Sequence, residues 1–185
     1  MIHSLFCLKI SDDSELNLLN LDDSEEFFYL MDSNRDFLEE WLPRISETKT
    51  ISDSKSFITL SLQKFDSGTA IRGAIRHRGK IAGTAGFKTI DPIHRKAEIY
   101  YWLGESFQGK GLVTLSIKSL IDYGFNILKL NRLELQCGKE NFRSIAVAER
   151  LGFTLEGVIR QAELKKGGFA DNCLYSLLYS DWSKK

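Results

Sequence analysis

A short glycine-rich segment carries the clearest chemical signal in this chain, and it stands between a strand-like run and a long helical pattern. The segment consists of Gln108, Gly109, Lys110, Gly111, Leu112, Val113 and Thr114. Glycine has no Cβ, so backbone N–H groups can turn toward a ligand, and the first amides of a helix attract anions. The segment therefore predicts a site for an anion such as pyrophosphate, with Lys110 adding a positive charge. Two glycines can also make an ordinary turn from strand to helix.

Two common nucleotide-binding motifs do not fit this segment. It lacks the Lys-Ser/Thr ending of a Walker A loop. The three strand-like runs before it predict an antiparallel meander, not the strand–helix–strand unit of a Rossmann site.

A second informative segment starts at Asn141 and places Ser144 three residues later, ahead of the helical run Ala146 to Leu151. Asparagine at this position predicts an N-cap for the helix, and Ser144 can support the first helical turn. Capping does not prevent the same residues from contacting a ligand.

Together, the two segments resemble the GNAT superfamily of N-acetyltransferases. In that family a Q/R-x-x-G-x-G/A loop binds the pyrophosphate of acetyl-CoA, and an asparagine at the start of the next helix helps to hold the pantetheine arm. Gln108 and Gly111 fit the loop and Asn141 fits the helix start, whereas Val113 stands where the pattern has Gly or Ala. The resemblance implies that acetyl-CoA is the cosubstrate and that residues 108–114 with Asn141 bind it.

A narrower resemblance, to RimJ/RimL-type enzymes, covers nearly the whole chain. It rests on three phrases: Asn34-Arg35 with Trp41-Leu42-Pro43, Tyr101-Trp102-Leu103-Gly104, and Thr154-Leu155-Glu156-Gly157. Those enzymes acetylate the N-termini of ribosomal proteins, and the family often forms dimers. The resemblance implies an N-terminal amine of a protein as acceptor, a homodimer as a possible assembly, and Ser144 and Glu163 as the catalytic acid and base.

Acetyl transfer needs a neutral amine, yet an α-amino group has a pKa near 8 and lysine one near 10.4, so a base is useful at pH 7. Glu163 is the expected base, with Glu156, Glu134 and Glu98 as rivals that the sequence does not separate. A backbone N–H of the Trp102–Leu103 region is expected to stabilise the negative charge that develops on the thioester oxygen. Ser144 is expected to assist the departing CoA thiolate, and Trp41 is expected to form a wall of the acceptor site.

Hydrophobic periodicity predicts a single α/β (α+β) domain over residues 1–185, with the order β-α-α-β-β-β-α-β-α-β-β. This order is that of the GNAT fold, with a mixed, mostly antiparallel seven-stranded sheet and about four helices. The expected strands cover residues 5–10, 69–77, 80–90, 94–103, 132–137, 153–164 and 169–180. The expected helices cover a region around 27–41 that follows the acidic stretch 12–26, and residues 52–65, 108–128 and 141–151.

Composition excludes several other classes of protein. Lysine plus arginine and aspartate plus glutamate each number 25, so no nucleic-acid surface is expected. The three cysteines and three histidines are not arranged for a disulfide framework or for a metal site. The N-terminus lacks the pattern of a signal peptide or a membrane span, so we expect a cytoplasmic protein.

Three functions remain open from the sequence. The leading one is acetylation of a protein N-terminus, with an acceptor groove formed by the region of the first two expected helices and the last hairpin. The second is acetylation of a small amine such as a polyamine or an antibiotic, to which the acidic residues between Asp12 and Glu26 could be attractive. The third is a regulatory module that binds acyl-CoA without turnover.

Overall fold

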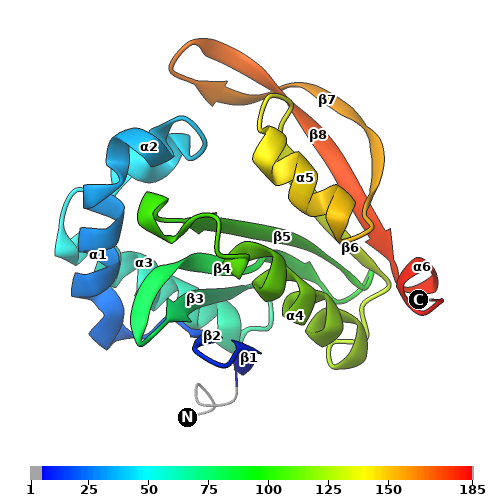
Figure 1. The fold of residues 1–185 in the computed structure, drawn as a ribbon, viewed down its shortest axis with the longest axis horizontal. Coiled ribbons are helices and arrows are strands. Elements are labelled where there is room, and N and C mark those ends of the chain that lie inside the picture. Colours follow the sequence, from blue (N-terminus) through cyan, green and yellow to red (C-terminus); the bar gives the residue numbers. More distant parts are fainter. Residues whose placement is uncertain (1–5, 185) are drawn as a thin grey trace.

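The computed structural model describes residues 6–184 of the chain, which form one mixed sheet flanked by helices (Figure 1). The strands are β1 (Cys7–Ser11), β2 (Ser14–Leu18), β3 (Ile71–His77), β4 (Lys80–Asp91), β5 (Lys96–Leu103), β6 (Arg132–Gly138), β7 (Thr154–Lys165) and β8 (Gly168–Leu178). The α-helices are α1 (Ser24–Ser33), α2 (Arg35–Glu39), α3 (Ile51–Asp66), α4 (Leu112–Asn126), α5 (Phe142–Arg150) and α6 (Tyr179–Trp182). Short 3-10 helices are η2 (Leu21–Asp23), η3 (Pro43–Glu47) and η4 (Glu105–Phe107).

The strand order in the sheet is β1-β2-β3-β4-β5-β6-β8-β7. Every neighbouring pair of these strands is antiparallel except β5 and β6, which are parallel and connected through α4. The prediction of a mixed, mostly antiparallel sheet is therefore confirmed. Leu5, where the first strand was expected to begin, lies outside the described residues.

The sheet has eight strands instead of the expected seven because β2 was missed. Ser14, Leu16 and Leu18 are buried and alternate with partly exposed Glu15 and Asn17, which is the period-two pattern of a strand. Acidic residues on both sides of this segment make the alternation hard to recognise from composition. The expected helical region near 27–41 is also divided, since α1 ends at Ser33 and α2 begins at Arg35, and α6 adds a further short helix.

The two faces of the sheet carry separate hydrophobic clusters. On one face α4 packs with buried residues that include Ile117, Leu120 and Ile121, the last two of which follow Ile117 by three and four residues, as in an amphipathic helix. On the other face α1 and α3 pack around Phe27 and Ile58. Figure 1 shows α1, α2 and α3 on one side of the molecule and α4 and α5 on the other. Residues that alternate along β5 therefore face two different environments.

The parallel strands β5 and β6 stay together over only part of their length. Their register runs from Lys96 opposite Arg132 to Ile99 opposite Leu135, although β5 continues to Leu103 and β6 to Gly138. Beyond Ile99 the two strands diverge, while β5 remains paired with β4 and β6 with β8. The sheet thus contains an opening between residues 100–103 and 136–138, and we call it the splay.

Gly83 of β4 supports one edge of the splay by allowing close approach of β5. A Cβ at this position would lie 2.1 Å from the Trp102 carbonyl oxygen, a contact that requires the backbone to move. We expect Gly83→Ala to lower the free energy of unfolding by about 1–3 kcal/mol, the usual cost of overpacking. Urea denaturation measures the change.

Gly157→Ala is the matched control for this experiment, because Gly157 also lies in a strand and a Cβ there meets nothing within 4 Å. Its stability should stay within about 0.5 kcal/mol of the unmodified protein. Equal destabilisation by both substitutions would contradict the steric explanation.

Candidate active site

The glycine-rich segment forms the turn from η4 into α4. Gly109 and Gly111 have φ values of 74° and 73°, in the left-handed region that glycine adopts without strain. Gly111 is the N-cap of α4 and makes no side-chain cap, so the first amides of the helix, at residues 112–114, have no capping side chain. This geometry suits an anion at the N-terminus of α4.

Three cationic side chains surround this turn. Lys110 donates from Nζ to the Ser106 carbonyl oxygen at 3.0 Å. Arg143 of α5 donates to Oε1 of Gln108, and Arg150 donates from Nη1 to Oγ1 of Thr114 at 3.1 Å. The combined positive charge favours a polyphosphate at this point.

Sequence reasoning missed both arginines. The signal that could have found them is their spacing, since residues seven apart lie on the same face of a helix. That face of α5 is turned toward the glycine-rich segment.

The splay leaves backbone groups of β5 without a strand partner. The Gly104 N–H donates to the Ala82 carbonyl oxygen at 2.9 Å, which directs the Gly104 amide toward β4. Because amides alternate in direction along a strand, those of Leu103 and Tyr101 point to the opposite edge, into the splay. The register of β5 with β4 is regular from Ile99 to Leu103, so β5 is splayed here and not bulged.

Ser144 lies on the α5 side of the splay, and both it and Cys137 are close to the Tyr101 side chain. Burial raises the pKa of Tyr101 to about 12, with Cys137 adding to the increase and Ser144 opposing it. The buried Tyr101 hydroxyl makes no hydrogen bond of ordinary geometry with the described residues, although Ser144 is close enough to affect its ionisation. Asn141 caps α5, since its Oδ1 accepts from the Ser144 N–H at 3.1 Å. The structure thus brings Asn141, Ser144 and Tyr101 together.

Trp41, Glu163 and Lys165 meet on the other side of the splay. The Lys165 Nζ lies 4.7 Å from the centroid of the Trp41 ring and 3.9 Å from Oε2 of Glu163. A Cβ on Gly138 would lie 3.3 Å from that Nζ and 3.8 Å from Cζ3 of Trp41. Gly138 and Cys137 are adjacent in β6, so they face opposite sides of the sheet. Trp102 also lies on this second side, in the cluster with Phe27.

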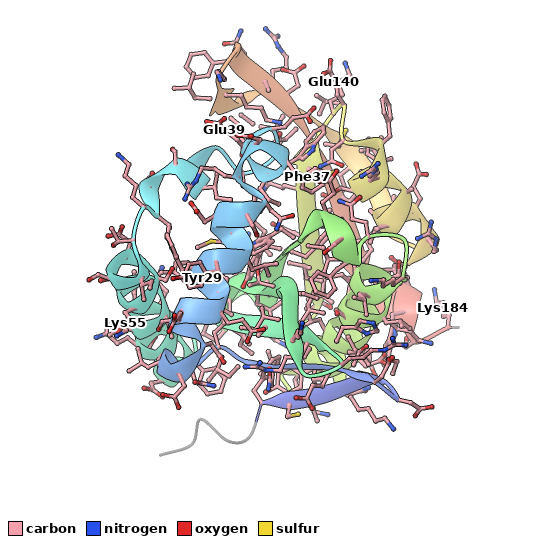
Figure 2. The ribbon with its side chains drawn as sticks, turned by 60° about the vertical axis from the view of Figure 1, so that its left-hand side comes forward. Tyr29, Phe37, Glu39, Lys55, Glu140 and Lys184 are labelled. Carbon is pink, nitrogen blue, oxygen red and sulfur yellow. The ribbon has the colours of Figure 1, made fainter. Side chains whose placement is uncertain are left out.

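Figure 2 gives the same arrangement from another direction. Glu39 at the end of α2 and Glu140 just before α5 lie at the end of the molecule that carries the β7–β8 hairpin. The hairpin, α2 and the start of α5 are therefore gathered around the open end of the splay.

Glu156, Glu134 and Glu98, the alternative candidates for the base, each form an ion pair with an arginine or a lysine. Glu156 accepts from Arg132 at 2.6 and 2.5 Å and from the Ser176 hydroxyl at 2.7 Å, and these bonds lower its pKa to about 2. Glu134 also pairs with Arg132, at 2.7 Å, and Glu98 pairs with Lys88 at 2.8 Å. Arg132 begins β6 and Glu98 lies where β5 and β6 are still paired, so this group is at the closed end of the splay.

Among residues 6–184, no group of three or more His, Cys, Asp and Glu side chains is placed to hold a metal ion. No helix in that part of the chain is long and apolar enough to cross a membrane.

Residues 15–154 match the family described as the acetyltransferase (GNAT) domain, and the chain belongs to this family. It is 28% identical over 169 residues to the ribosomal-protein-serine acetyltransferase of Escherichia coli (strain K12), covering 91% of this chain and 94% of that protein. The microcin C7 self-immunity acetyltransferase MccE, solved with acetyl-CoA and AMP, superposes with a TM-score of 0.88 at 37% identity over 92% of this chain and 94% of that one. RimL, a ribosomal L7/L12 alpha-N-protein acetyltransferase solved with coenzyme A, gives a TM-score of 0.91 at 28% identity over 95% of this chain and 99% of that one.

The predicted GNAT fold and RimJ/RimL-like character are therefore confirmed. The chain is an acetyl-CoA-dependent N-acetyltransferase, and acetyl-CoA is its cosubstrate. The glycine turn, its cations and the splay fit a long, phosphate-bearing acyl carrier.

Gly111→Glu tests the glycine turn. A glutamate there would carry a side chain at a positive φ and place a negative charge where the pyrophosphate is expected. We expect the Kd for acetyl-CoA to rise at least about tenfold, equivalent to about 1.4 kcal/mol, as measured by calorimetry.

Gly68→Glu is the matched control, because Gly68 has φ 70° and equally open surroundings in the turn after α3. It should keep the affinity of the unmodified protein. Unchanged affinity in Gly111→Glu would rule out the turn as the pyrophosphate site.

Proposed function

We propose that the chain transfers acetyl from acetyl-CoA to the N-terminal α-amine of a protein, with a ribosomal protein as acceptor. The observation that carries this proposal is the cluster of Trp41, Glu163 and Lys165, which already holds an ammonium group against an aromatic face and a carboxylate. A protonated acceptor amine is also an ammonium group, so it can bind to the same aromatic face and carboxylate. The names of the E. coli and RimL relatives support a protein N-terminus as the source of that amine.

The arrangement on the two sides of the splay supports direct attack of the amine on the thioester of acetyl-CoA in a ternary complex. The phosphate-binding turn, Tyr101 and Ser144 lie on the side of α4 and α5, and Trp41 and Glu163 lie on the side of α2 and the hairpin. An acyl group in the splay would be reached from one side by its carrier and from the other by the amine. No covalent acetyl-enzyme is needed for this geometry.

Glu163 has the role of the base in this proposal. Its side chain is 32% exposed and faces the acceptor side, so it can receive the ammonium proton directly or through one water. Among the alternatives, Glu156 is held by Arg132, whose hydrogen bonds lower the Glu156 pKa to about 2 and make it a poor base. Glu134 and Glu98 lie with it at the closed end of the splay, away from Trp41 and Lys165.

In this proposal the Leu103 N–H, which points into the splay, donates to the thioester oxygen as negative charge develops on it. Ser144, next to the Tyr101 hydroxyl, has the role of donating a hydrogen bond to the departing thiolate in this proposal. A hydrogen bond is sufficient here because a thiolate with a pKa near 8.5 is a tolerable leaving group.

A polyamine is the second candidate acceptor, and a specific hollow favours it. A cavity of about 380 Å³ between α1, α2 and η4 is lined by three carboxylates, Asp32, Asp36 and Glu105. These acids could hold the distant ammonium groups of a polyamine. Arg35 also lines this cavity and reduces its negative charge.

Thiol release with acetyl-CoA separates the candidates. The acceptors are peptides with free Ser or Ala N-termini, the same peptides with blocked N-termini, spermidine and aminoglycosides. Selective turnover of the free peptides is the expected result. Turnover of the small amines alone would overturn the proposal in favour of the second candidate, and turnover of none would contradict both.

Glu163→Gln tests the base. The substitution keeps the size of the side chain but removes the carboxylate that accepts the proton, so kcat/KM for a free-N-terminus peptide should fall by about 100-fold or more at neutral pH. The Kd for acetyl-CoA should not change. Raising the pH should recover part of the rate, because more of the amine is then neutral.

Glu156→Gln is the control, since Glu156 is a strand glutamate held by Arg132 and Ser176. It should alter stability and leave kcat nearly unchanged. If Glu156→Gln reduced kcat as much as Glu163→Gln, the assignment of the base would be wrong.

A further inference from the structure

Near its end, β7 directs the side chains of Glu163 and Lys165, which are two residues apart, toward the splay. Between Ile159 and Glu163 the register with β8 shifts, and Gln161 there has φ 50°. The Gln161 N–H donates to Oδ1 of Asp171 at 2.9 Å, which fixes this irregularity. After it, Glu163 and Lys165 are half-buried and alternate with exposed neighbours, so both lie on the same face of the hairpin.

Lys165 occupies the position that the proposed function gives to an acceptor amine. Its Nζ lies between the Trp41 ring, at 4.7 Å, and the Glu163 carboxylate, at 3.9 Å. The Nζ also lies over Gly138, which borders the splay. Because Gly138 has no side chain, nothing from this residue stands between the Nζ and the splay. The lysine is 20% exposed and therefore points toward the protein and not into solvent.

We propose that Lys165 is a self-acetylation site: with acetyl-CoA bound and no external acceptor present, the chain acetylates its own Lys165 Nζ. The inference rests on the proposed function, because it uses the same base and the same side of the splay. Neutral Nζ attacks the thioester carbonyl carbon, the N–C bond forms and the C–S bond breaks. Glu163 takes one ammonium proton before attack and later releases it to solvent. The second proton leaves the nitrogen as the amide forms and is taken up by the departing CoA thiolate, which becomes the thiol.

Acetylation would change the acceptor site itself. The product is a neutral amide, so the cation–π contact with Trp41 and the ion pair with Glu163 both disappear. The aromatic face and the carboxylate would then be available to an external amine. Self-acetylation at this position would thus remove an internal competitor of the acceptor.

The test is incubation of the full chain with acetyl-CoA alone, followed by intact mass measurement and peptide mapping. We expect one acetyl group on Lys165, added at a rate constant that does not depend on protein concentration, since the reaction is within one chain. Lys166 is the internal reference for uncatalysed acetylation, because it is an exposed lysine next in sequence. Lys165 should react at least about tenfold faster than Lys166 if base catalysis operates.

Three variants make the test decisive. Lys165→Arg should gain no acetyl group, Glu163→Gln should slow the modification by at least about tenfold, and Lys166→Arg should be modified like the unmodified protein. Equal rates at Lys165 and Lys166, or equal rates with and without Glu163, would overturn the inference. Thiol release on a free-N-terminus peptide is measured on the same sample, so turnover of the peptide without modification of Lys165 would overturn the self-acetylation alone.

Discussion

The divergence of β5 from β6 is the constraint on which the rest of this structure depends. Parallel strands normally satisfy each other's backbone along their full length, yet here pairing stops at Ile99 and Leu135. The Leu103 N–H therefore faces an opening instead of a strand partner. In this position it can donate a hydrogen bond to an acyl carbonyl oxygen. The pairs β4–β5 and β6–β8 hold the two halves in place, so the opening persists as part of the fold.

The electrostatics of the two sides of the splay are complementary to two different substrates. Lys110, Arg143 and Arg150 gather around a helix N-terminus and favour phosphates, whereas Trp41 and Glu163 favour an ammonium group. Neighbouring residues of a strand point to opposite faces of the sheet, so adjacent residues such as Cys137 and Gly138 face different environments. In the proposed function, a single sheet thus presents an anionic carrier and a cationic acceptor to each other from separate sites.

The sequence predicts the glycine turn and the Asn141 cap well, because both depend on local backbone chemistry. It also predicts most strands, but β2 is hidden among acids and is recognised only when Leu16 and Leu18 are seen buried. The spacing of Arg143 and Arg150 indicates that they share one face of a helix, but their partners Gln108 and Thr114 are far away in the chain, as Trp41 is from Lys165. The same holds for the rival carboxylates, which become distinguishable only when Arg132 is found beside Glu156 and Glu134.

The central claim is that the acyl arm of acetyl-CoA lies in the splay, against the free edge of β5. Amide hydrogen exchange of the individual residues, with and without a non-hydrolysable acetyl-CoA analogue, tests it most directly. The amides of Tyr101 and Leu103 should become protected, while that of Trp102, which points toward β4, changes little. Protection confined to residues 109–114, with unchanged exchange at Tyr101 and Leu103, would show that the phosphates bind at the turn but the arm lies elsewhere, and would contradict the account.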